Sequence, residues 1–409
     1  MSRSLEKDLV VEMRYIDIFA GCGGLSVGLQ SAGWQGIFAI EKNKDAFSTL
    51  KYNLIDHGHH FQWPDWLEVK EHDIKKFLDD NEDKLRELEG QVDLVAGGPP
   101  CQGFSLAGKR DLSDSRNKLV KQYIRFVELV KPRALIFENV HGFTVHFQSQ
   151  KGRISQYSSY VINKLEDLGY HTDSKVIDVS QYGVPQKRRR FILVAMLDSN
   201  PSEVFKHLEN NKSSFCRKKG IKQSTTIQDA IGDLEEANGT CQSPDTKRFQ
   251  AGFYGHAESG YQRLMRHGLQ NHQGAVDSHR FVNHTAAVIQ LHRDLLDNAP
   301  RGKRITPDDG YVENLKRRGV TVLDANSQAP TITSIPDELV HYEEPRILTV
   351  REQARIQSFP DWFEFKGKYT SGGKLRKKEV PRYTQVGNAV PPLFAEQVGR
   401  ALMEVMTHG

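Results

Sequence analysis

The sequence predicts an α/β protein built on a doubly wound, parallel sheet, and two observations carry this prediction. Short β-branched or aromatic runs alternate with amphipathic stretches over the first 200 of the 409 residues, as strands alternate with covering helices. After residue 200 this alternation is lost, and it returns only near the C-terminus. Because the chain is about twice as long as a typical domain, we also expect a second, smaller and irregular domain.

The expected strands are apolar runs that would be buried on both faces of the sheet. They lie at 15–20, 36–41, 92–98, 133–140 and 189–196. Helical periods lie at 25–32, 119–130, 155–168, 348–359 and 391–406. Thr349 is an N-cap candidate for the fourth of these helices, and prolines begin the fifth, as the first turn of a helix allows. Sheets of this type bind ligands at the carboxyl ends of their strands, so we expect the site there.

Composition and cysteine usage exclude several classes of protein. Hydrophobic residues make up 38% of the chain, and no apolar run approaches the roughly 20 residues that span a bilayer, so we expect no membrane segment. The four cysteines have neither disulfide-framework nor metal-ligand spacing, so no metal site is expected. Free thiols fit a reducing compartment, which indicates a cytoplasmic protein.

The charge of the irregular region supports two interpretations. Residues 201–320 contain 18 Lys and Arg against 14 Asp and Glu. Basic clusters lie at 217–219, 301–304, 316–318 and 374–378. A basic surface that faces an acidic polymer is one interpretation, and ordinary solvated loops are the other.

The first predicted strand leads into the glycine-rich turn "DIFAGCGG", at 17–24. Glycines let the backbone approach a ligand closely, and free amides at a helix start attract an anionic group. A dinucleotide site is the nearest alternative, but Ser26 replaces the third glycine of its G-x-G-x-x-G pattern. Glu41 has the spacing of an acidic residue that binds a ribose diol, so the cofactor is predicted to be nucleoside-like, although a tight turn without a ligand stays open. Asp73 lies where a further strand would end, and it suits either the exocyclic amine of an adenine or the N-cap of a helix.

Later strands end or begin with groups that can carry chemistry. "GGPPCQGFS", at 97–105, puts Cys101 behind two prolines; as a nucleophile this thiol would need nearby positive charge or a helix start, and a small buried side chain is the alternative. Glu138 lies at the end of an apolar strand, where a carboxylate is costly unless it is paired, which makes it a functional candidate. A cap of the next turn is the alternative. Alternation along the last strand sends Arg188 and Arg190 to one face, where they would bind phosphate, orient a base or lie on a solvated edge.

Taken in order, six segments closely resemble the motifs of the DNA cytosine-5 methyltransferases of bacterial type. They are "DIFAGCGG", "GGPPCQGFS", "ENV", "QKRRR", "RILTVREQARIQSFP" and "QVGNAVPP". "PTITS", at 330–334, looks like the segment that precedes the late motifs of that family. The resemblance covers about 14–200 and 320–407, and the part left out falls where the family keeps its variable target-recognition region.

This resemblance implies a fold in three parts. Residues 1–200 would form the first part of a Rossmann-like, S-adenosylmethionine-dependent methyltransferase domain, 201–345 a small target-recognition domain, and 346–409 a C-terminal return. S-adenosylmethionine would be the cofactor, with Phe19 stacked on its adenine and Glu41 holding its ribose. The residues implied in cofactor binding are Phe19, Gly21, Gly23, Gly24, Leu25, Glu41, Asp73, Ile74, Pro100, Leu119, Asn388 and Ala389.

The same resemblance implies the chemistry. Cys101 would add to carbon 6 of a cytosine flipped out of the duplex, and carbon 5 would then take the methyl group. Glu138 would donate a hydrogen bond to nitrogen 3, while Arg190, with Arg188 beside it, would stabilise the 2-oxo group. The segment 102–116 would close over the site as a lid.

Double-stranded DNA is the implied substrate. The implied setting is a monomer in the bacterial cytoplasm, associated with the nucleoid, with a cognate restriction endonuclease as a further partner. A tRNA cytosine-5 methyltransferase is one alternative, against which the extended region between the motifs argues. A catalytically silent DNA-binding regulator of the same fold is another, against which the intact Cys101 and Glu138 argue.

Overall fold

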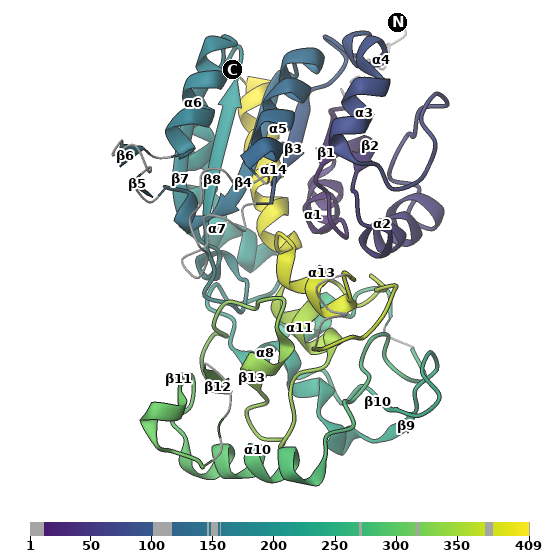
Figure 1. The fold of residues 1–409 in the computed structure, drawn as a ribbon, viewed down its shortest axis with the longest axis vertical. Coiled ribbons are helices and arrows are strands. Elements are labelled where there is room, and N and C mark those ends of the chain that lie inside the picture. Colours follow the sequence, from purple (N-terminus) through teal and green to yellow (C-terminus); the bar gives the residue numbers. More distant parts are fainter. Residues whose placement is uncertain are drawn as a thin grey trace, which may run out of the picture.

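The structure is a computed structural model that describes residues 12–100, 117–144, 147–148, 154–155, 157–269, 272–313, 315, 319–372 and 379–408. A six-stranded sheet in the order β2-β1-β3-β4-β8-β7 forms the upper part of the molecule (Figure 1). Its strands are β1 (Arg14–Ile18), β2 (Gln35–Ile40), β3 (Leu94–Gly97), β4 (Ala134–Val140), β7 (His171–Asp178) and β8 (Arg189–Met196). Helices pack on both faces of this sheet, so the predicted doubly wound α/β class is confirmed.

The sheet is mixed, and the expectation of a fully parallel sheet is wrong. β1 pairs in parallel with β2 and β3, and β3 with β4, but β8 pairs antiparallel with both β4 and β7. β7 was not predicted from the sequence, because most residues of this edge strand are polar and only Ile177 is buried in it. Because β8 runs in the opposite direction, its first residues lie at the carboxyl end of β4, where Arg190 pairs with Val140.

Two helical layers cover the sheet, and successive residues of β1 point into their two cores alternately. One layer consists of α1 (Gly24–Ala32), α7 (Pro201–Lys218) and α14 (Pro392–His408). The other consists of α3 (Ile74–Asp80), α5 (Asn117–Val130) and α6 (Tyr157–Asp167). Tyr15 belongs to the core of the first layer, and Ile16 belongs to that of the second. α1 and α14 pack against each other, so the last helix completes the layer that the first helix begins.

Local sequence signals place several helix starts. Thr349 accepts a hydrogen bond from the backbone N–H of Glu352, whose carboxylate accepts one in return, and this capping box begins α11 (Val350–Ile356) as predicted. Asn43 caps α2 (Lys44–Leu50), which a π-helical turn at 51–56 continues. The residues before Asp73 form turns, so its expected place at a strand end is wrong; its side chain caps α3 instead. The short α4 (Glu82–Arg86) follows α3.

The lower part of the molecule holds shorter elements. They are α8 (Ile227–Ile231), β9 (Thr240–Gln242), β10 (Gln250–Gly252), α9 (Gly260–Met265), α10 (Ala286–Asn298), β11 (Arg304–Ile305), β12 (Val320–Val322) and β13 (Leu339–Val340). α11 and α13 (Arg382–Asn388) lie between this part and the sheet (Figure 1). The hairpin strands β5 (Phe147–Gln148) and β6 (Ile154–Ser155) lie beside β7 in the same view.

The two parts of the molecule share a core. α7, which begins at the predicted domain boundary, packs against α14, β7 and β8. Ile231 and Tyr261, from the lower part, belong to the same hydrophobic cluster as Leu25 of α1. The division into three segments at 200 and 345 therefore stays a prediction. Among the described helices, none combines the length and the apolar character needed to cross a membrane.

Candidate functional site

A cavity of about 450 Å³ lies at the carboxyl ends of β1, β2, β3 and β4 and the first residues of β8. The predicted site residues that line it are Phe19, Gly21, Gly24, Leu25, Glu41, Pro100, Glu138, Arg188, Arg190, Asn388 and Ala389. The fold thus brings the end of α13 against the first strand, although these segments lie at opposite ends of the sequence.

Other predicted site residues lie elsewhere. Gly23 precedes α1 in the left-handed conformation, with φ 97°. Asp73 accepts hydrogen bonds from the first amides of α3 and pairs with Lys42 at 2.6 Å. Ile74 and Leu119 pack in the hydrophobic core on the α3 and α5 side of the sheet. Cys101 and the expected lid at 102–116 lie outside the described residues, so their roles stay predictions.

The turn after β1 is held to the end of β2 by Glu41. The backbone N–H of Gly21 donates to Glu41 Oε2 at 2.9 Å, and that of Asn43 donates to Oε1 at 2.7 Å. Burial raises the pKa of Glu41 above its usual value. Phe19 has φ 61°, a strained conformation for a bulky residue, which the surrounding turn must enforce. Backbone strain of this kind clusters at active sites and ligand clamps.

Asp17 is a cavity residue that the sequence reasoning missed. Its side chain is fully buried in the middle of β1, Ser26 Oγ donates to its Oδ2 at 2.6 Å, and its Oδ1 has no partner. Burial raises its pKa to about 7. An aspartate inside the apolar run "YIDIF" was the signal that could have identified it, because a buried carboxylate without a full set of partners is costly.

Glu138 and Arg190 form an ion pair at the ends of β4 and β8. Arg190 Nε lies 2.9 Å from Glu138 Oε1, and the two side chains are only 14% and 15% exposed. Gly98 leaves room for this carboxylate, since a Cβ there would lie 2.8 Å from Glu138 Oε2. Asn139 Nδ2 donates to the carbonyl of Pro99 at 3.1 Å and so ties the segment before Cys101 to β4. A carboxylate and a guanidinium are therefore held side by side at the rim.

Arg188 lies in the same cavity wall but is engaged with the backbone. Its Nη1 donates to the carbonyl of Ile332, and its Nη2 donates to those of Gly387 and Ala389. Arg189, between the two arginines, is exposed, as alternation along a strand requires. The two predicted arginines thus face one cavity with different partners.

Cys22 is a described thiol that lines the cavity, and it is a poor nucleophile. Its Sγ donates to the carbonyl of Gln385 at 3.6 Å, and burial raises its pKa to about 12. A thiol with this pKa stays protonated at neutral pH. Cys22 therefore does not compete with Cys101 as the candidate for covalent chemistry.

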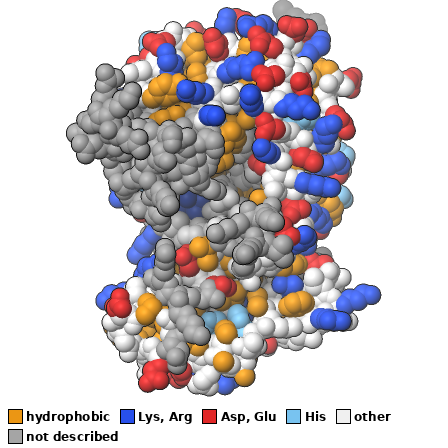
Figure 2. Space-filling model, viewed as in Figure 1, with side chains coloured by type: hydrophobic (Ala, Val, Ile, Leu, Met, Phe, Trp, Pro, Cys, Tyr) orange, Lys and Arg blue, Asp and Glu red, His pale blue; other side chains and the backbone are white. Residues whose placement is uncertain are grey.

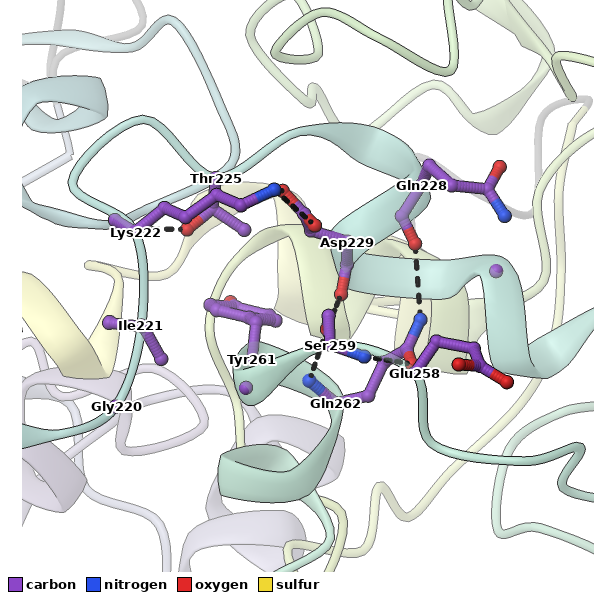
Figure 3. A pocket seen from close by; sticks show the side chains of 12 residues that line it. Gly220, Ile221, Lys222, Thr225, Gln228, Asp229, Glu258, Ser259, Tyr261 and Gln262 are labelled. Atoms are coloured by element: carbon purple, nitrogen blue, oxygen red, sulfur yellow. Dashed lines mark hydrogen bonds and ion pairs between the residues drawn. The ribbon is translucent and has the colours of Figure 1, made fainter.

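A second cavity, of about 480 Å³, lies in the lower part of the molecule at the starts of α8 and α9 (Figure 3). Its polar side chains bond to one another: Lys222 pairs with Asp229 at 3.0 Å, and Ser259 Oγ donates to the carbonyl of Asp229 at 2.5 Å. Ser259 also caps α9 through Gln262. Because Lys222, Asp229, Ser259 and Gln262 are engaged with one another in this way, we read the cavity as a joint between two helices rather than as a candidate site.

The predicted basic clusters are only partly described. Those at 316–318 and 374–378 lie outside the described residues. Lys219 pairs with Glu396 at 2.8 Å, and Arg301 donates to the carbonyl of Leu296 at 3.0 Å. Figure 2 shows basic and acidic side chains intermixed over the upper part in this view. Both interpretations of the charge, a DNA-facing surface and solvated loops, stay open.

The chain is similar to known proteins over nearly its whole length. The family model described as C-5 cytosine-specific DNA methylase matches residues 13–404. The Type II methyltransferase M.XorII of Xanthomonas oryzae is 32% identical over 405 residues, which is 96% of this chain and 84% of that protein. The Type II methyltransferase M1.HphI of Haemophilus parahaemolyticus is 30% identical over 413 residues, which is 97% of this chain and 88% of that protein. The crystal structure of a DNA modification methyltransferase from an E. coli prophage has a TM-score of 0.65 at 23% identity and covers 97% of this chain and 100% of that chain, a likeness in fold.

Proposed function

The chain belongs to the C-5 cytosine-specific DNA methylase family, and we propose that it transfers a methyl group from S-adenosylmethionine to carbon 5 of a flipped-out cytosine in a specific duplex DNA sequence. One observation carries the proposal: a single cavity gathers Glu41, the Glu138–Arg190 pair and Pro100, the residue before Cys101. Cofactor-dependent addition to a pyrimidine requires a carboxylate suited to a ribose, a group that shares a proton with the base, and a thiol; Glu41 and Glu138 would supply the first two, and Cys101 would supply the third.

The cavity residues fit S-adenosylmethionine, which supplies an electrophilic methyl group when bound. Glu41 keeps lone pairs for the ribose hydroxyls beyond those that Gly21 and Asn43 use. Asp17 Oδ1 is a buried acceptor without a partner, suited to the ammonium group of the cofactor. Phe19 would stack on the adenine. Asp73, which is used by α3 and Lys42, fits its N-cap role better than contact with adenine.

The chemistry begins at carbon 6 of the cytosine. The Cys101 thiolate would form a bond to carbon 6, which makes carbon 5 nucleophilic and places negative charge on nitrogen 3 and the 2-oxo group. Glu138 would donate a proton to nitrogen 3, and Arg190, held 2.9 Å from it, would stabilise the oxygen. Carbon 5 would then take the methyl group, with S-adenosylhomocysteine as the leaving group. Loss of the carbon 5 proton to solvent would eliminate the Cys101 thiolate, and return of the nitrogen 3 proton to Glu138 would restore the ring.

Access to the base requires that it leave the helix. Carbons 5 and 6 cannot be reached inside stacked DNA, and flipping a base out costs a few kcal/mol. We place the target-recognition function in the irregular region at 201–345, whose phosphate contacts would position the duplex while other side chains read the sequence. The segment 102–116 would close over the flipped base.

Methyl transfer tests the proposed function directly. Unmethylated phage DNA of mixed sequence should accept radiolabelled methyl groups from S-adenosylmethionine, and tRNA should not. Cys101→Ser should abolish both methyl transfer and covalent capture of DNA that contains 5-fluorocytosine, while S-adenosylhomocysteine binding persists; Cys241→Ser, at another free cysteine, is the matched control.

Three outcomes would contradict parts of the proposal. A folded protein that methylates no cytosine-containing DNA would refute the activity. Preferential methylation of tRNA would move the substrate to RNA. Undiminished capture by Cys101→Ser would mean that another residue attacks carbon 6.

A further inference from the structure

Three buried polar side chains join the wall of the cavity formed by 387–389 to the strand that carries Arg190. They are Gln186, Arg188 and Gln357. Gln186 and Arg188 lie in the segment just before β8, and Gln357 is the C-cap of α11. Gln186 and Gln357 are fully buried, and Arg188 is 2% exposed. Long polar side chains are rarely buried so completely unless their hydrogen bonds are made inside the protein.

Arg188 and Gln357 hold the same short stretch of backbone. Arg188 Nη2 donates to the carbonyls of Gly387 at 3.0 Å and Ala389 at 3.2 Å. Gln357 Nε2 donates to the carbonyls of Val386 at 2.8 Å and Ala389 at 3.1 Å. A carbonyl oxygen has two lone pairs, so these two side chains use both lone pairs of Ala389.

Gln186 links these two side chains to a third segment. Its Nε2 donates to Gln357 Oε1 at 2.6 Å, and its Oε1 accepts from the backbone N–H of Ile332 at 2.8 Å. Arg188 Nη1 donates to the carbonyl of the same Ile332 at 3.0 Å. Gly387 packs so closely on this segment that an added Cβ would lie 2.5 Å from the backbone carbon of Thr333. We call Gln186, Arg188 and Gln357 the clasp.

The clasp connects the two sides of the proposed reaction. Asn388 and Ala389 line the cavity on the side proposed for the cofactor, and Ala389 ends α13 in an extended conformation, where helical hydrogen bonds no longer hold it. Arg190, two residues after Arg188, pairs with Glu138 on the side proposed for the base. Methyl transfer requires the reacting atoms to lie about 3–3.5 Å apart, and a misplacement of about 1 Å lowers the rate about 100-fold.

We propose that the clasp sets the position of the 387–389 wall against the Glu138–Arg190 pair, and that Arg188 is a positioning residue rather than a contact of the base. This inference rests on the proposed function, because it assigns the wall to the cofactor. Both terminal nitrogens of Arg188 donate to backbone carbonyls, and only its buried Nε has no partner, whereas Arg190 is the arginine that pairs with Glu138.

Gln357→Leu tests the proposal, and Gln397→Leu is its matched control. Gln397 is also buried, and its Nε2 also donates to two carbonyls, those of Tyr182 and Leu393, but neither of these two residues lines the cavity, as Ala389 does. Both variants should lower the melting temperature by similar amounts. Gln357→Leu should raise the Kd for S-adenosylhomocysteine and the KM for S-adenosylmethionine at least tenfold, whereas Gln397→Leu should change both less than twofold.

Arg188→Lys provides a second variant if Gln357→Leu does not fold. It keeps the charge but loses the fork that reaches two segments, so the Kd for S-adenosylhomocysteine should rise while the affinity for DNA without cofactor changes less than twofold. Equal cofactor affinity in Gln357→Leu and Gln397→Leu, or a loss of DNA affinity alone in Arg188→Lys, would overturn the positioning role. A wild-type protein that binds no S-adenosylhomocysteine would refute the proposed function instead.

Discussion

At the scale of single residues, burial decides the protonation of Asp17. The carboxylate lies in the middle of β1 with one hydrogen bond, from Ser26, and no other partner. In the unfolded chain its pKa is the ordinary 3.8, and in the folded protein without cofactor burial raises it to about 7. The folded state therefore loses stability as the pH rises from about 4, and the full loss is reached above pH 7.

Asp17→Asn should remove this dependence on pH. The amide oxygen of Asn can still accept the hydrogen bond from Ser26, but no proton is lost at high pH. The difference in free energy of unfolding between variant and wild type should shift by about 2 kcal/mol in favour of the variant from pH 5.5 to pH 8.5. Urea unfolding of the cofactor-free proteins at both values measures it, and an unchanged difference would contradict the raised pKa.

At the scale of elements, the sequence predicted which residues meet at the rim better than it predicted how the strands run. Apolar runs that end in Glu41 and Glu138 identified strand ends directly. Arg190 was expected there although a parallel β8 would have carried it to the opposite edge; the observed antiparallel β8 is what places it beside Glu138. Strand direction depends on connections across the fold, which local periodicity does not encode.

The packing of α1 on α14 gives a test at this scale. Gly28 allows the close approach, since a Cβ there would lie 2.5 Å from the carbonyl oxygen of Pro392 and 2.7 Å from the backbone nitrogen of Glu396. Gly28→Ala should lower the free energy of unfolding by about 1–3 kcal/mol, because the backbone of α14 must shift. Ser31→Ala, at an exposed position of the same helix, should change it by less than about 0.5 kcal/mol. Equal effects of both changes in urea unfolding would show that the two helices are not tightly packed.

At the scale of the whole molecule, buried charges join α11, which lies next to the sheet (Figure 1), to the lower part. Arg355 is fully buried and pairs with Asp233, which follows α8, at 3.0 Å and with Asp361 at 2.6 Å. Burial alone would raise the pKa of Asp361, but Arg355 holds it below its usual value. Sequence reasoning found α11 and its cap, but it did not find these pairs, because their partners are up to 122 residues apart.

Replacement of Arg355 tests whether this buried arginine stabilises the protein more than an exposed arginine does. Arg355→Leu removes the nearest cation from two buried carboxylates, which keep only the more distant Arg266, 3.2 Å from Asp233, and Arg351, 3.7 Å from Asp361, so the free energy of unfolding should fall by about 3–5 kcal/mol. The loss should be larger at pH 8 than at pH 5, because burial without Arg355 would raise the pKa of Asp361 and penalise its charged form. Arg86→Leu, which removes an exposed pair with Glu82 on α4, should have a much smaller effect that does not depend on pH in this range. Urea unfolding at both pH values would contradict the interpretation if the two variants behaved alike.

The pairing of α1 with α14 also determines when an active enzyme first exists during synthesis. The cavity needs Asp17 from the first strand and Ala389 from the last loop, so it cannot form until the ribosome has released residue 389. At a synthesis rate of about 5–20 residues per second, roughly 20 to 70 s pass between the synthesis of α1 and that of α14, which covers the apolar face of α1. During that interval the nascent chain lacks the complete cavity, so methylation cannot begin before residue 389 has been made.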